Sequence, residues 1–512
     1  MKKNFVKRIL SLVLVLSLAI VPVTVKASAL PEPAMPFPTQ GDYAITATLP
    51  PDSVQTDEMI FNLFMEILNN NLIVDSNSQA NKDYFRLVLQ HTDYWGLYGD
   101  PNDYGGYLTE DGINSHINVS ESQGYGMVML AYMAGSEEKI NASGYNWIYD
   151  CTSLQEYYNA MLRTVQQFPS SIGPHLFTWE LFGYRDYFDY YPEGYKEEDG
   201  VKSAPFYQNP DDADNAIDGD MDIIYSLLLA DKQWGSDGEY NYKEVALTML
   251  ADLWDYCVHK EYKTLLLGDW ASVTKDEKLK NATRASDFML DHLKAFAAAD
   301  PSHNWQEVID ATYNVIGEIR EAQIAEGNTN GFLPDFIVRG KNGWEVPSGY
   351  VLEDDSLDGG FGYNSCRVPW RLGTDYLLNG DTEIGEGSLY EYCVEPLDVF
   401  ARTIAGFGSD NDISRFGPFP IDAASFEEGT APLYTEPSLF TAPFLVTAAG
   451  VGFDQEWVGL FYEGWEEWYY DEEAEDWLPA HADVSMFTGD TYSDYIKLLV
   501  LITASGNWWL PL

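Results

Sequence analysis

The chain has 512 residues, with 81 Asp and Glu against 29 Lys and Arg, and its formal net charge at pH 7 is −52. Such an excess of negative charge argues against nucleic acid or an anionic membrane surface as a partner. Aromatic residues make up 15% of the chain, with 15 Trp and 35 Tyr, which is more than a core requires. Acidic and aromatic side chains together are typical of a sugar-binding cleft, because pyranose faces stack on aromatic rings.

The first 29 residues have the pattern of a secretory signal peptide. Four basic residues precede an apolar run from Ile9 to Val23, and the segment ends in Ala-Ser-Ala. The run is short for a membrane span, which needs about 20 apolar residues. We therefore expect residues 1–29 to be removed and the protein to be secreted and extracellular. Losing five basic and no acidic residues leaves 24 Lys and Arg against 81 Asp and Glu, a net charge of −57.

Helical patterns dominate the remainder of the chain. Residues 30–56 begin with a Pro-rich stretch and are predicted to form an extended arm, and residues 57–512 a single domain. Few runs alternate with a period of two, so no large sheet is expected. The predicted class is all-α, with six helical hairpins arranged as a barrel and long loops between them. Helices are expected near 57–71, 121–135, 153–168, 218–232, 241–258, 285–298, 304–324, 367–378, 390–405, 437–449, 455–467 and 490–503.

The cysteines give no disulfide framework and no metal site. Four cysteines allow three complete pairings, and the sequence leaves open whether they form one or two bridges or remain buried thiols. No pair of cysteines is spaced as in CxxC, and no Cys/His cluster suggests zinc. The four are Cys151, Cys257, Cys366 and Cys393.

The first of three segments with chemical potential is Val119–Met127, which opens a strongly apolar helix. Glu121 falls in the first turn of this helix, where the helix dipole favours a negative charge, and this alone would explain it. However, Gly124 and Gly126 are costly within a helix. They make sense if another part of the chain must approach the backbone closely.

The second segment places three carboxylates at alternate positions before a helix, at Asp218, Asp220 and Asp222. A calcium loop of this kind needs Gly at its sixth position and Glu at its twelfth. Those positions hold Ile223 and Leu229, so the pattern does not fit calcium. The cluster instead suits a site that positions water and stabilises positive charge on a sugar ring.

The third segment runs from Gly362 to Tyr376 and carries two arginines, Arg367 and Arg371. The arginines are four residues apart on a helix that begins here, so they share one face. Ion pairs with an acidic surface would explain either arginine alone.

Together these segments resemble family 8 of the glycoside hydrolases over almost the whole mature chain. The family includes inverting endo-glucanases, lichenases, xylanases and chitosanases, and the resemblance implies an (α/α)6 barrel with residues 57–512 as its single catalytic domain. The matching motifs are S-E-x-x-G-Y-G-M at Ser120–Met127, D-G-D-x-D-I with its helical tail at Asp218–Gly235, Leu267–Trp270, Arg284–Met289, R-V-P-W-R at Arg367–Arg371 and Gly506–Trp509.

The resemblance also implies roles for individual residues. Glu121 matches the general acid of the family, and Asp218 matches the aspartate that holds the distorted sugar at the cleavage subsite. Tyr363 and Arg367 match residues that line the same subsite. Three further aromatic residues match or neighbour positions that stack on sugar rings: Trp179, Trp270 and Tyr495.

The chain departs from most of the family at the catalytic base. Many members have an Asp directly after the Tyr of the third motif, where this chain has Asn364, and an amide cannot accept the proton of an attacking water. The resemblance is then to a subgroup of lichenases, cellulases and bacillus-type chitosanases, whose base is a Glu on an inserted loop just upstream. The local match at 350–355 implies Glu353 as the base. Asp354 remains the alternative, because ungapped counting back from Arg367 ends on it.

The implied activity is endo-hydrolysis of β-1,4-glucan or mixed-linkage β-1,3-1,4-glucan. Residues 364–375 look more like the glucanase members, since the chitosanases tend to lack Trp370 and the Gly-Thr after it. An endo-chitosanase is an alternative, because a charge of −57 would attract a polyamine chain, although it could equally reflect a salty or alkaline habitat. A non-catalytic carbohydrate-binding protein is the third interpretation. We expect a monomer that binds a polysaccharide, without metal, cofactor, nucleic acid or membrane.

Overall fold

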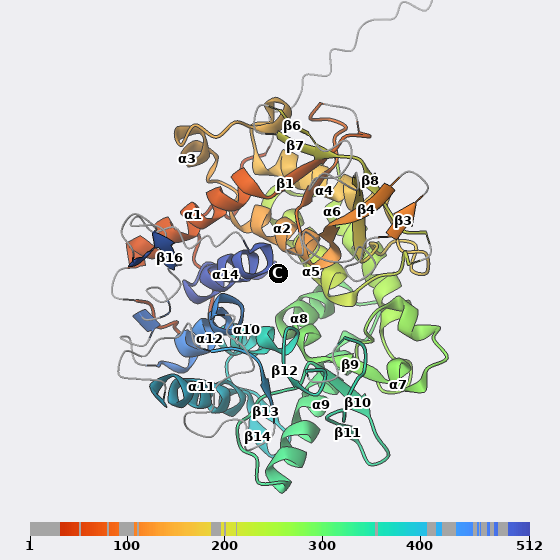
Figure 1. The fold of residues 1–512 in the computed structure, drawn as a ribbon, viewed down its shortest axis with the longest axis vertical. Helices are drawn as coiled ribbons and strands as arrows, with labels where there is room; N and C mark the ends of the chain where they lie inside the picture. Colours follow the sequence, from red (N-terminus) through yellow and green to blue (C-terminus); the bar gives the residue numbers. More distant parts are fainter. Residues whose placement is uncertain are drawn as a thin grey trace, which may run out of the picture. The chain divides into compact units, whose positions relative to one another are not determined.

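Helices make up most of the regular structure in the computed structural model of the chain (Figure 1). Residues 33–512 group into one unit, which contains all the described helices and strands. The structure describes residues 31–50, 53–78, 81–91, 107–109, 112–185, 196–198, 201–210, 212–353, 357–406, 416–421, 437–453, 458–459, 461, 468–471, 476–479 and 490–511.

Six of the described helices form an inner ring. Each of them packs against the next inner helix along the chain. The last of them contacts the first, which closes the ring. Most of their residues are buried, which is why their sequences are apolar on nearly every face. The six are α2 (Ser120–Tyr132), α5 (Ile217–Trp234), α8 (Leu290–Ala299), α10 (Val368–Asn379), α12 (Pro437–Val451) and α14 (Thr491–Ala504).

A second set of described helices packs on the outside of this ring. Helix α1 packs on α14, α4 on α2, α6 on α5, α9 on α8, and α11 on α10 and α12. This alternation of inner and outer helices is the (α/α)6 barrel predicted from the sequence. The predicted stretch 455–467 lies mostly outside the described residues. The outer helices are α1 (Ser53–Asn70), α4 (Leu154–Gln167), α6 (Tyr242–Asp252), α9 (Trp305–Ala325) and α11 (Leu389–Gly406), and the short helices are α3 (Glu137–Ala142) and α7 (Glu277–Lys280).

Three predicted helices differ clearly from the structure at their ends. The one predicted at 57–71 begins at Ser53, inside the stretch 30–56 predicted as an extended arm. The predicted helix at 285–298 begins only at Leu290, because residues 282–284 pair in a small sheet and Ala285–Asp287 form a 3-10 turn. The predicted helix at 241–258 is regular to Asp252 and ends in a π-helical turn, Leu253–Cys257. All four cysteines are buried free thiols. In the described part of the chain, no helix has both the length and the apolarity needed to cross a membrane.

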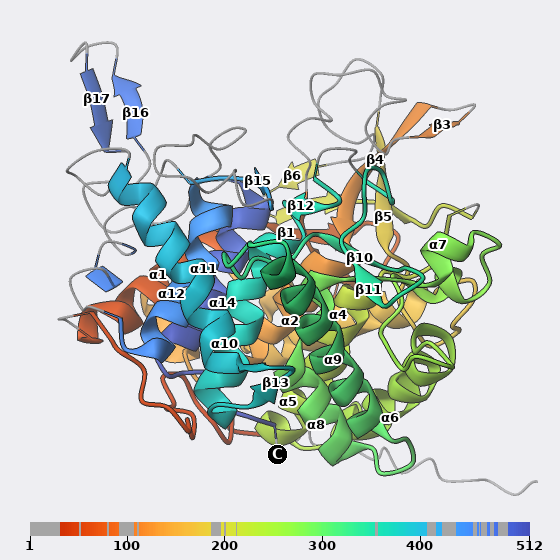
Figure 2. The ribbon, with the colours of Figure 1, turned by 90° about the horizontal axis from the view of Figure 1, so that it is seen from below.

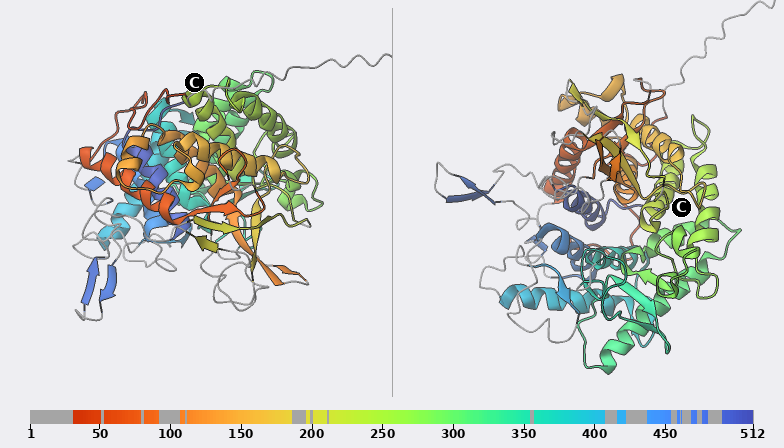
Figure 3. Two further views of the ribbon diagram at one scale, coloured as in Figure 1. Left: turned by 90° about the horizontal axis from the view of Figure 1, so that it is seen from above. Right: turned by 45° about the vertical axis from the view of Figure 1, so that its right-hand side comes forward.

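The described strands form small sheets of two to four strands. Figures 2 and 3 show several of them, including β3, β4 and β5, at one end of the barrel and the C-terminus at the opposite end. Strand β4 runs directly into α2, so this is the end where that inner helix begins. The strands are β1 (Leu72–Asp75), β2 (Leu87–Leu89), β3 (Tyr107–Thr109), β4 (Gly112–Val119), β5 (Glu180–Arg185), β6 (Lys196–Glu198), β7 (Val201–Ala204), β8 (Phe206–Tyr207), β9 (Ala282–Arg284), β10 (Phe336–Arg339), β11 (Trp344–Glu345), β12 (Gly360–Phe361), β13 (Glu383–Ile384), β14 (Gly387–Ser388), β15 (Phe419–Pro420), β16 (Trp468–Asp471) and β17 (Asp476–Pro479).

The N-terminal arm, residues 33–50, covers the opposite end of the barrel. Its backbone N–H groups donate to carbonyls at or just beyond the C-terminal ends of five inner helices, α5, α2, α14, α10 and α12. The last four carbonyls of a helix have no partner within it, so the arm satisfies groups that would otherwise need water. The bonds are Ala34 to Gln233, Phe37 to Ala134, Gly41 to Gly506, Ile45 to Leu377 and Thr48 to Ala449, with lengths of 2.7–3.0 Å.

Helices α2 and α5 approach each other more closely than side chains would allow. A Cβ atom added at Gly124 would lie 2.7 Å from Cβ of Asp222, and one added at Gly219 would lie 2.4 Å from the carbonyl carbon of Ser120. The close backbone approach expected from the sequence at Gly124 is therefore present. It places the first turns of the two helices side by side.

We expect Gly219→Ala to destabilise the protein by about 1–3 kcal/mol, because the new methyl group meets backbone that cannot move aside. The free energy of unfolding in urea would measure the loss. Gly238→Ala is the control, since a Cβ there has nothing within 4 Å. Equal stability of the two variants would show that the contact does not require a glycine.

Candidate active site

A cavity of about 1170 Å³ opens where α2, α5 and α14 begin. It exceeds the roughly 300–1,000 Å³ of most small-molecule sites, so it suits an extended ligand. Aromatic, acidic and basic side chains share its wall. The lining residues are His91, Val119, Ser120, Glu121, Trp179, Asp212, Asp214, Asn215, Ala216, Asp218, Leu267, Trp270, Arg284, Leu352, Glu353, Tyr363, Asn364, Arg367, Leu439, Asp490, Thr491 and Tyr492.

Glu121 reaches the cavity from the first turn of α2, and 17% of its side chain is exposed. Tyr125, one turn further along the helix, donates its hydroxyl to Oε1 of Glu121 at 2.7 Å, and Nη1 of Arg367 contacts the same oxygen. Burial raises the pKa of the Glu121 carboxyl, the negative charge of Asp218 adds to the rise, and Arg367 opposes it without reversing it. This environment favours the protonated acid.

Asp218 lies in the first turn of α5, close to Glu121, and it has the opposite protonation tendency. Its Oδ1 is 3.1 Å from Nη2 of Arg284, and its Oδ2 is 3.2 Å from Nη1 of Arg367. Burial acts to raise the pKa of Asp218, but the two guanidinium groups outweigh burial and lower it. Asp218 is therefore held as a carboxylate.

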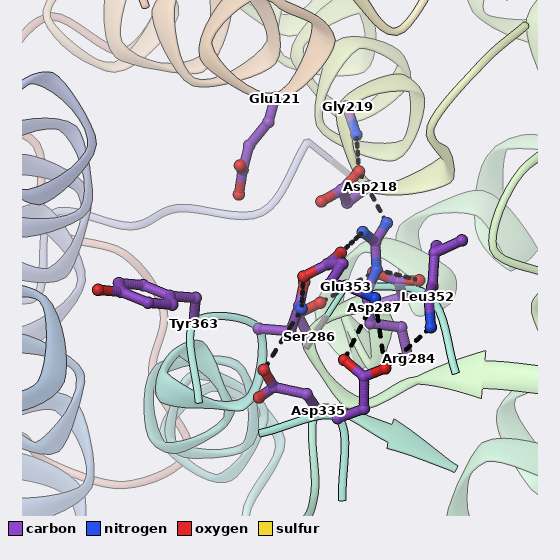
Figure 4. A network of polar contacts seen from close by, with 12 residues as sticks. Glu121, Asp218, Gly219, Arg284, Ser286, Asp287, Asp335, Leu352, Glu353 and Tyr363 are labelled. Atoms are coloured by element: carbon purple, nitrogen blue, oxygen red, sulfur yellow. Dashed lines mark hydrogen bonds and ion pairs between the residues drawn. The ribbon is translucent and has the colours of Figure 1, made fainter. Parts of the chain in front are cut away.

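Glu353 faces the same space from the loop that precedes β12, and 44% of its side chain is exposed. Figure 4 shows Glu121 entering from α2 and Glu353 from the other side of this space, with Asp218 to one side. The Asn364 amide donates to Oε2 of Glu353 at 2.8 Å, and Nη1 of Arg284 lies 3.9 Å from Oε1. The alternative base, Asp354, lies outside the described residues.

Arg367 connects the walls of the cavity. Only 2% of its side chain is exposed, and beyond Glu121 and Asp218 it donates from Nη2 to Oδ1 of Asn364 at 3.1 Å. Arg371 lies one helical turn deeper, where it pairs with Asp222 at 3.0 Å and does not line the cavity. The two arginines thus share a helix face, as predicted, at different depths.

Three of the four predicted aromatic residues line the cavity, and the prediction for Tyr495 is wrong. Trp179 and Trp270 are half-buried in its wall, and Tyr363 is 38% exposed. Tyr495 is fully buried, and its hydroxyl donates to the carbonyl of Gln90 at 2.5 Å. Helix α14 turns Tyr495 toward the core and presents Tyr492, one turn earlier, to the cavity.

Several residues of the site were not predicted from the sequence, among them four aromatic or basic side chains. Tyr492 lies beneath the Arg367 guanidinium, 5.7 Å from it, and His91 packs edge-on against the Tyr492 ring. Tyr125 could have been found from its position four residues after Glu121, and Arg284 stands within a motif already noticed. Nothing local marks His91 or Tyr492, because only the closed barrel brings them to the cavity.

The arrangement supports acid and base chemistry on a sugar. A carboxyl with a raised pKa and a partly exposed carboxyl face one space, with an ionised Asp218 beside it, and aromatic rings line the wall. In the described part of the chain, no group of three or more His, Cys, Asp and Glu is placed to hold a metal ion. Glycoside hydrolases use a carboxyl group with a raised pKa together with a second carboxyl group across the sugar site.

Comparison with known proteins places the chain in a family. Residues 202–353 match the family described as glycosyl hydrolases family 8. The chain is 32% identical over 391 residues to a β-glucanase of Niallia circulans, an alignment that covers 76% of this chain and 77% of that protein. The chain therefore belongs to family 8 of the glycosyl hydrolases.

Other relatives extend this likeness along the chain. An endoglucanase of Bacillus sp. strain KSM-330 is 26% identical over 493 residues, which cover 95% of this chain and 84% of that protein. The solved structure of a β-1,3-1,4-glucanase from Paenibacillus sp. X4 is 28% identical, with a TM-score of 0.66 over 93% of this chain and 99% of that one. A cold-adapted family 8 xylanase, 14% identical with a TM-score of 0.57 over 90% of this chain and 97% of that one, shares the fold.

We expect Asp218→Asn to move the alkaline limb of the kcat/KM profile to lower pH. The negative charge of Asp218 raises the pKa of Glu121, so its removal lets Glu121 lose the acid proton at a lower pH. Initial rates across pH would measure the shift. Asp231→Asn, at the far end of α5, is the control and must leave the limb in place. A shift to higher pH would contradict the coupling.

Proposed function

We propose that the chain is a secreted, inverting endo-β-glucanase that cleaves mixed-linkage β-1,3-1,4-glucan or β-1,4-glucan. One observation carries the proposal. Glu121, whose pKa is raised by burial, and Glu353, which is partly exposed, face one space from opposite sides in an aromatic-lined cavity. Inverting hydrolysis needs one acid and one base placed in this way.

In the proposed mechanism Glu121 is the general acid. Its proton passes to the glycosidic oxygen as the bond to the anomeric carbon breaks, so the leaving sugar departs as an alcohol. Tyr125 donates to the same carboxyl oxygen that contacts Arg367, and this bond fixes the orientation of Glu121. The carboxyl can then present its proton toward the cavity.

Glu353 is the proposed base. It takes a proton from a water molecule, whose oxygen attacks the anomeric carbon on the face opposite the leaving group, so the configuration at that carbon inverts. Asn364 cannot perform this step because an amide is not basic, but its N–H bond points at Glu353. Exposure of Glu353 to the cavity leaves room for the water.

Asp218, Arg367 and Tyr363 are proposed to bind the sugar at the point of cleavage. The charge on Asp218, held by two arginines, faces the region where positive charge develops on the ring, and so stabilises the transition state. The rings of Trp179 and Trp270 would stack on neighbouring sugars. The large cavity supports attack within a polysaccharide chain.

The substrate proposal draws on the relatives. The Niallia circulans protein is named a β-glucanase, and the Paenibacillus structure a β-1,3-1,4-glucanase, and each aligns with more than three quarters of this chain. Secretion is proposed from the N-terminal pattern of a basic head, an apolar run and Ala-Ser-Ala.

The function is tested by release of reducing sugar from barley β-glucan, carboxymethyl cellulose, xylan and chitosan in parallel. We expect barley β-glucan or carboxymethyl cellulose to be cut fastest, with a rapid fall in viscosity because cleavage is internal. Proton NMR of the first products should show the α-anomer, since a β-linkage is inverted. Faster cleavage of chitosan would change the substrate class, and no cleavage of any polymer would favour a carbohydrate-binding protein.

The proposed acid is tested by removing its proton. Glu121→Gln should lower kcat at least about 1,000-fold because the amide has no acidic proton, while binding of an oligosaccharide persists. Calorimetric titration with a glucan oligosaccharide would measure the binding. An unchanged kcat would refute the acid assignment.

The base is identified by comparing Glu353→Ala with Asp354→Ala. We expect kcat to fall about 100-fold or more only in the first variant. A loss confined to the second would transfer the role to Asp354.

A further inference from the structure

The side-chain amide of Asn364 has a single orientation that its partners dictate. Arg367 can only donate, so Oδ1 of Asn364 faces its Nη2 at 3.1 Å. Glu353 accepts, so Nδ2 of Asn364 faces its Oε2 at 2.8 Å. Only 4% of Asn364 is exposed, and a rotated amide would oppose donor to donor at Arg367. Asn364 therefore directs a hydrogen bond at the proposed base.

A buried carboxyl holds the turn that carries this amide. Oδ1 of Asp335 accepts the backbone N–H groups of Gly362 at 2.9 Å and Ser365 at 2.7 Å, and the hydroxyl of Ser365 at 2.6 Å. Its Oδ2 lies 3.5 Å from Nδ2 of Asn364. Figure 4 shows Asp335 below Glu353, on the side away from Glu121. Asp335 thus fixes the backbone on both sides of Asn364.

The other charged groups near Glu353 contact its carboxyl group less closely than the Asn364 amide does. Arg284 of β9 lies 3.9 Å away and is itself engaged by Asp218. Asp358, on the same loop, accepts the backbone N–H groups of Leu352 and Glu353 and so anchors the loop, not the carboxyl. Of these contacts, only the hydrogen bond from Asn364 is a short contact to the carboxyl group of Glu353 itself.

We propose that Asp335 is a positioning residue for hydrolysis, which locks the 362–365 turn so that the Asn364 amide orients the carboxyl group of Glu353 toward the attacking water. This inference rests on the proposed role of Glu353 as the base. Burial raises the pKa of Asp335 to about 6 and the charge of Glu353 contributes, while the hydrogen bonds from Ser365 oppose the rise. Asp335 does not line the cavity, and it acts through the turn that carries Asn364.

The test is a double-mutant cycle with Asp335→Asn and Asn364→Ala, assayed on barley β-glucan. In Asp335→Asn the new amide turns its oxygen to the Gly362 and Ser365 N–H groups, so its NH₂ faces that of Asn364 and displaces it. We expect kcat to fall about 10- to 100-fold with KM within about twofold. The double variant should match Asn364→Ala within about twofold, because Asp335 has nothing left to position.

Asp300→Asn is the matched control. Asp300 is also a buried carboxyl that accepts a backbone N–H and the hydroxyl of a serine, Ser302, but it lies in the turn between α8 and α9. Its loss should lower the melting temperature and leave kcat unchanged. A purely structural role for Asp335 would give the same result.

Three outcomes would overturn the inference. Wild-type kcat in Asp335→Asn would do so, as would effects that multiply in the double variant. If Asp335→Asn does not fold, the test passes to Asn364→Ala. The acidic limb of its kcat profile must move to higher pH, because the ionised form of Glu353 loses a hydrogen-bond donor. An unmoved limb would reject the proposal. Glu353→Ala separates the two hypotheses. Full activity of Glu353→Ala would show that Glu353 is not the base. If Glu353→Ala is inactive but Asp335→Asn is fully active, only the proposed role of Asp335 is rejected.

Discussion

Helices α2 and α5 touch backbone to backbone at Gly124 and Gly219, and the site depends on that contact. It brings two helix starts together, each with an acidic side chain, Glu121 or Asp218. Two neighbouring carboxyl groups resist being ionised at once, so their charges divide unequally. The arginines determine which carboxyl group is ionised more readily, because Asp218 pairs with both Arg284 and Arg367 while Glu121 contacts only Arg367. Packing between helices thus raises the pKa of the Glu121 carboxyl, whereas the arginines lower that of Asp218.

The buried guanidinium of Arg367 makes the three walls of the cavity interdependent. It contacts α2 through Glu121, α5 through Asp218 and its own turn through Asn364. A buried charge deprived of one partner costs several kcal/mol, roughly 3–5 for a broken pair, so stability and site geometry are coupled. The groups that would perform the chemistry are held in place before any sugar enters, which reduces the reorganisation needed in the transition state.

The features that could be predicted from the sequence are those that local spacing controls. Glu121, Asp218 and Arg367 each stand at a helix start within a motif that resembles family 8, and that resemblance also implies the barrel. The sequence could not show that Tyr492 rather than Tyr495 lines the cavity, because it does not fix how α14 is placed relative to the cavity. Tyr495 lies in the core, and Tyr492, one turn earlier, lines the cavity. Asp335 follows a proline in a stretch without regular pattern. Its contacts with the 362–365 turn form only when that turn folds onto it. Such contacts belong to the tertiary structure.

The N-terminal arm has a consequence for the order of assembly. Its N–H groups bond to carbonyls that lie from about one hundred to more than four hundred and fifty residues later in the chain, the last of them at Gly506. A ribosome makes the arm first, yet its final partner emerges almost at the end of synthesis. The sealed barrel is therefore a post-synthetic product, and contacts so distant in sequence slow folding. This end of the barrel cannot close until both the arm and Gly506 are available.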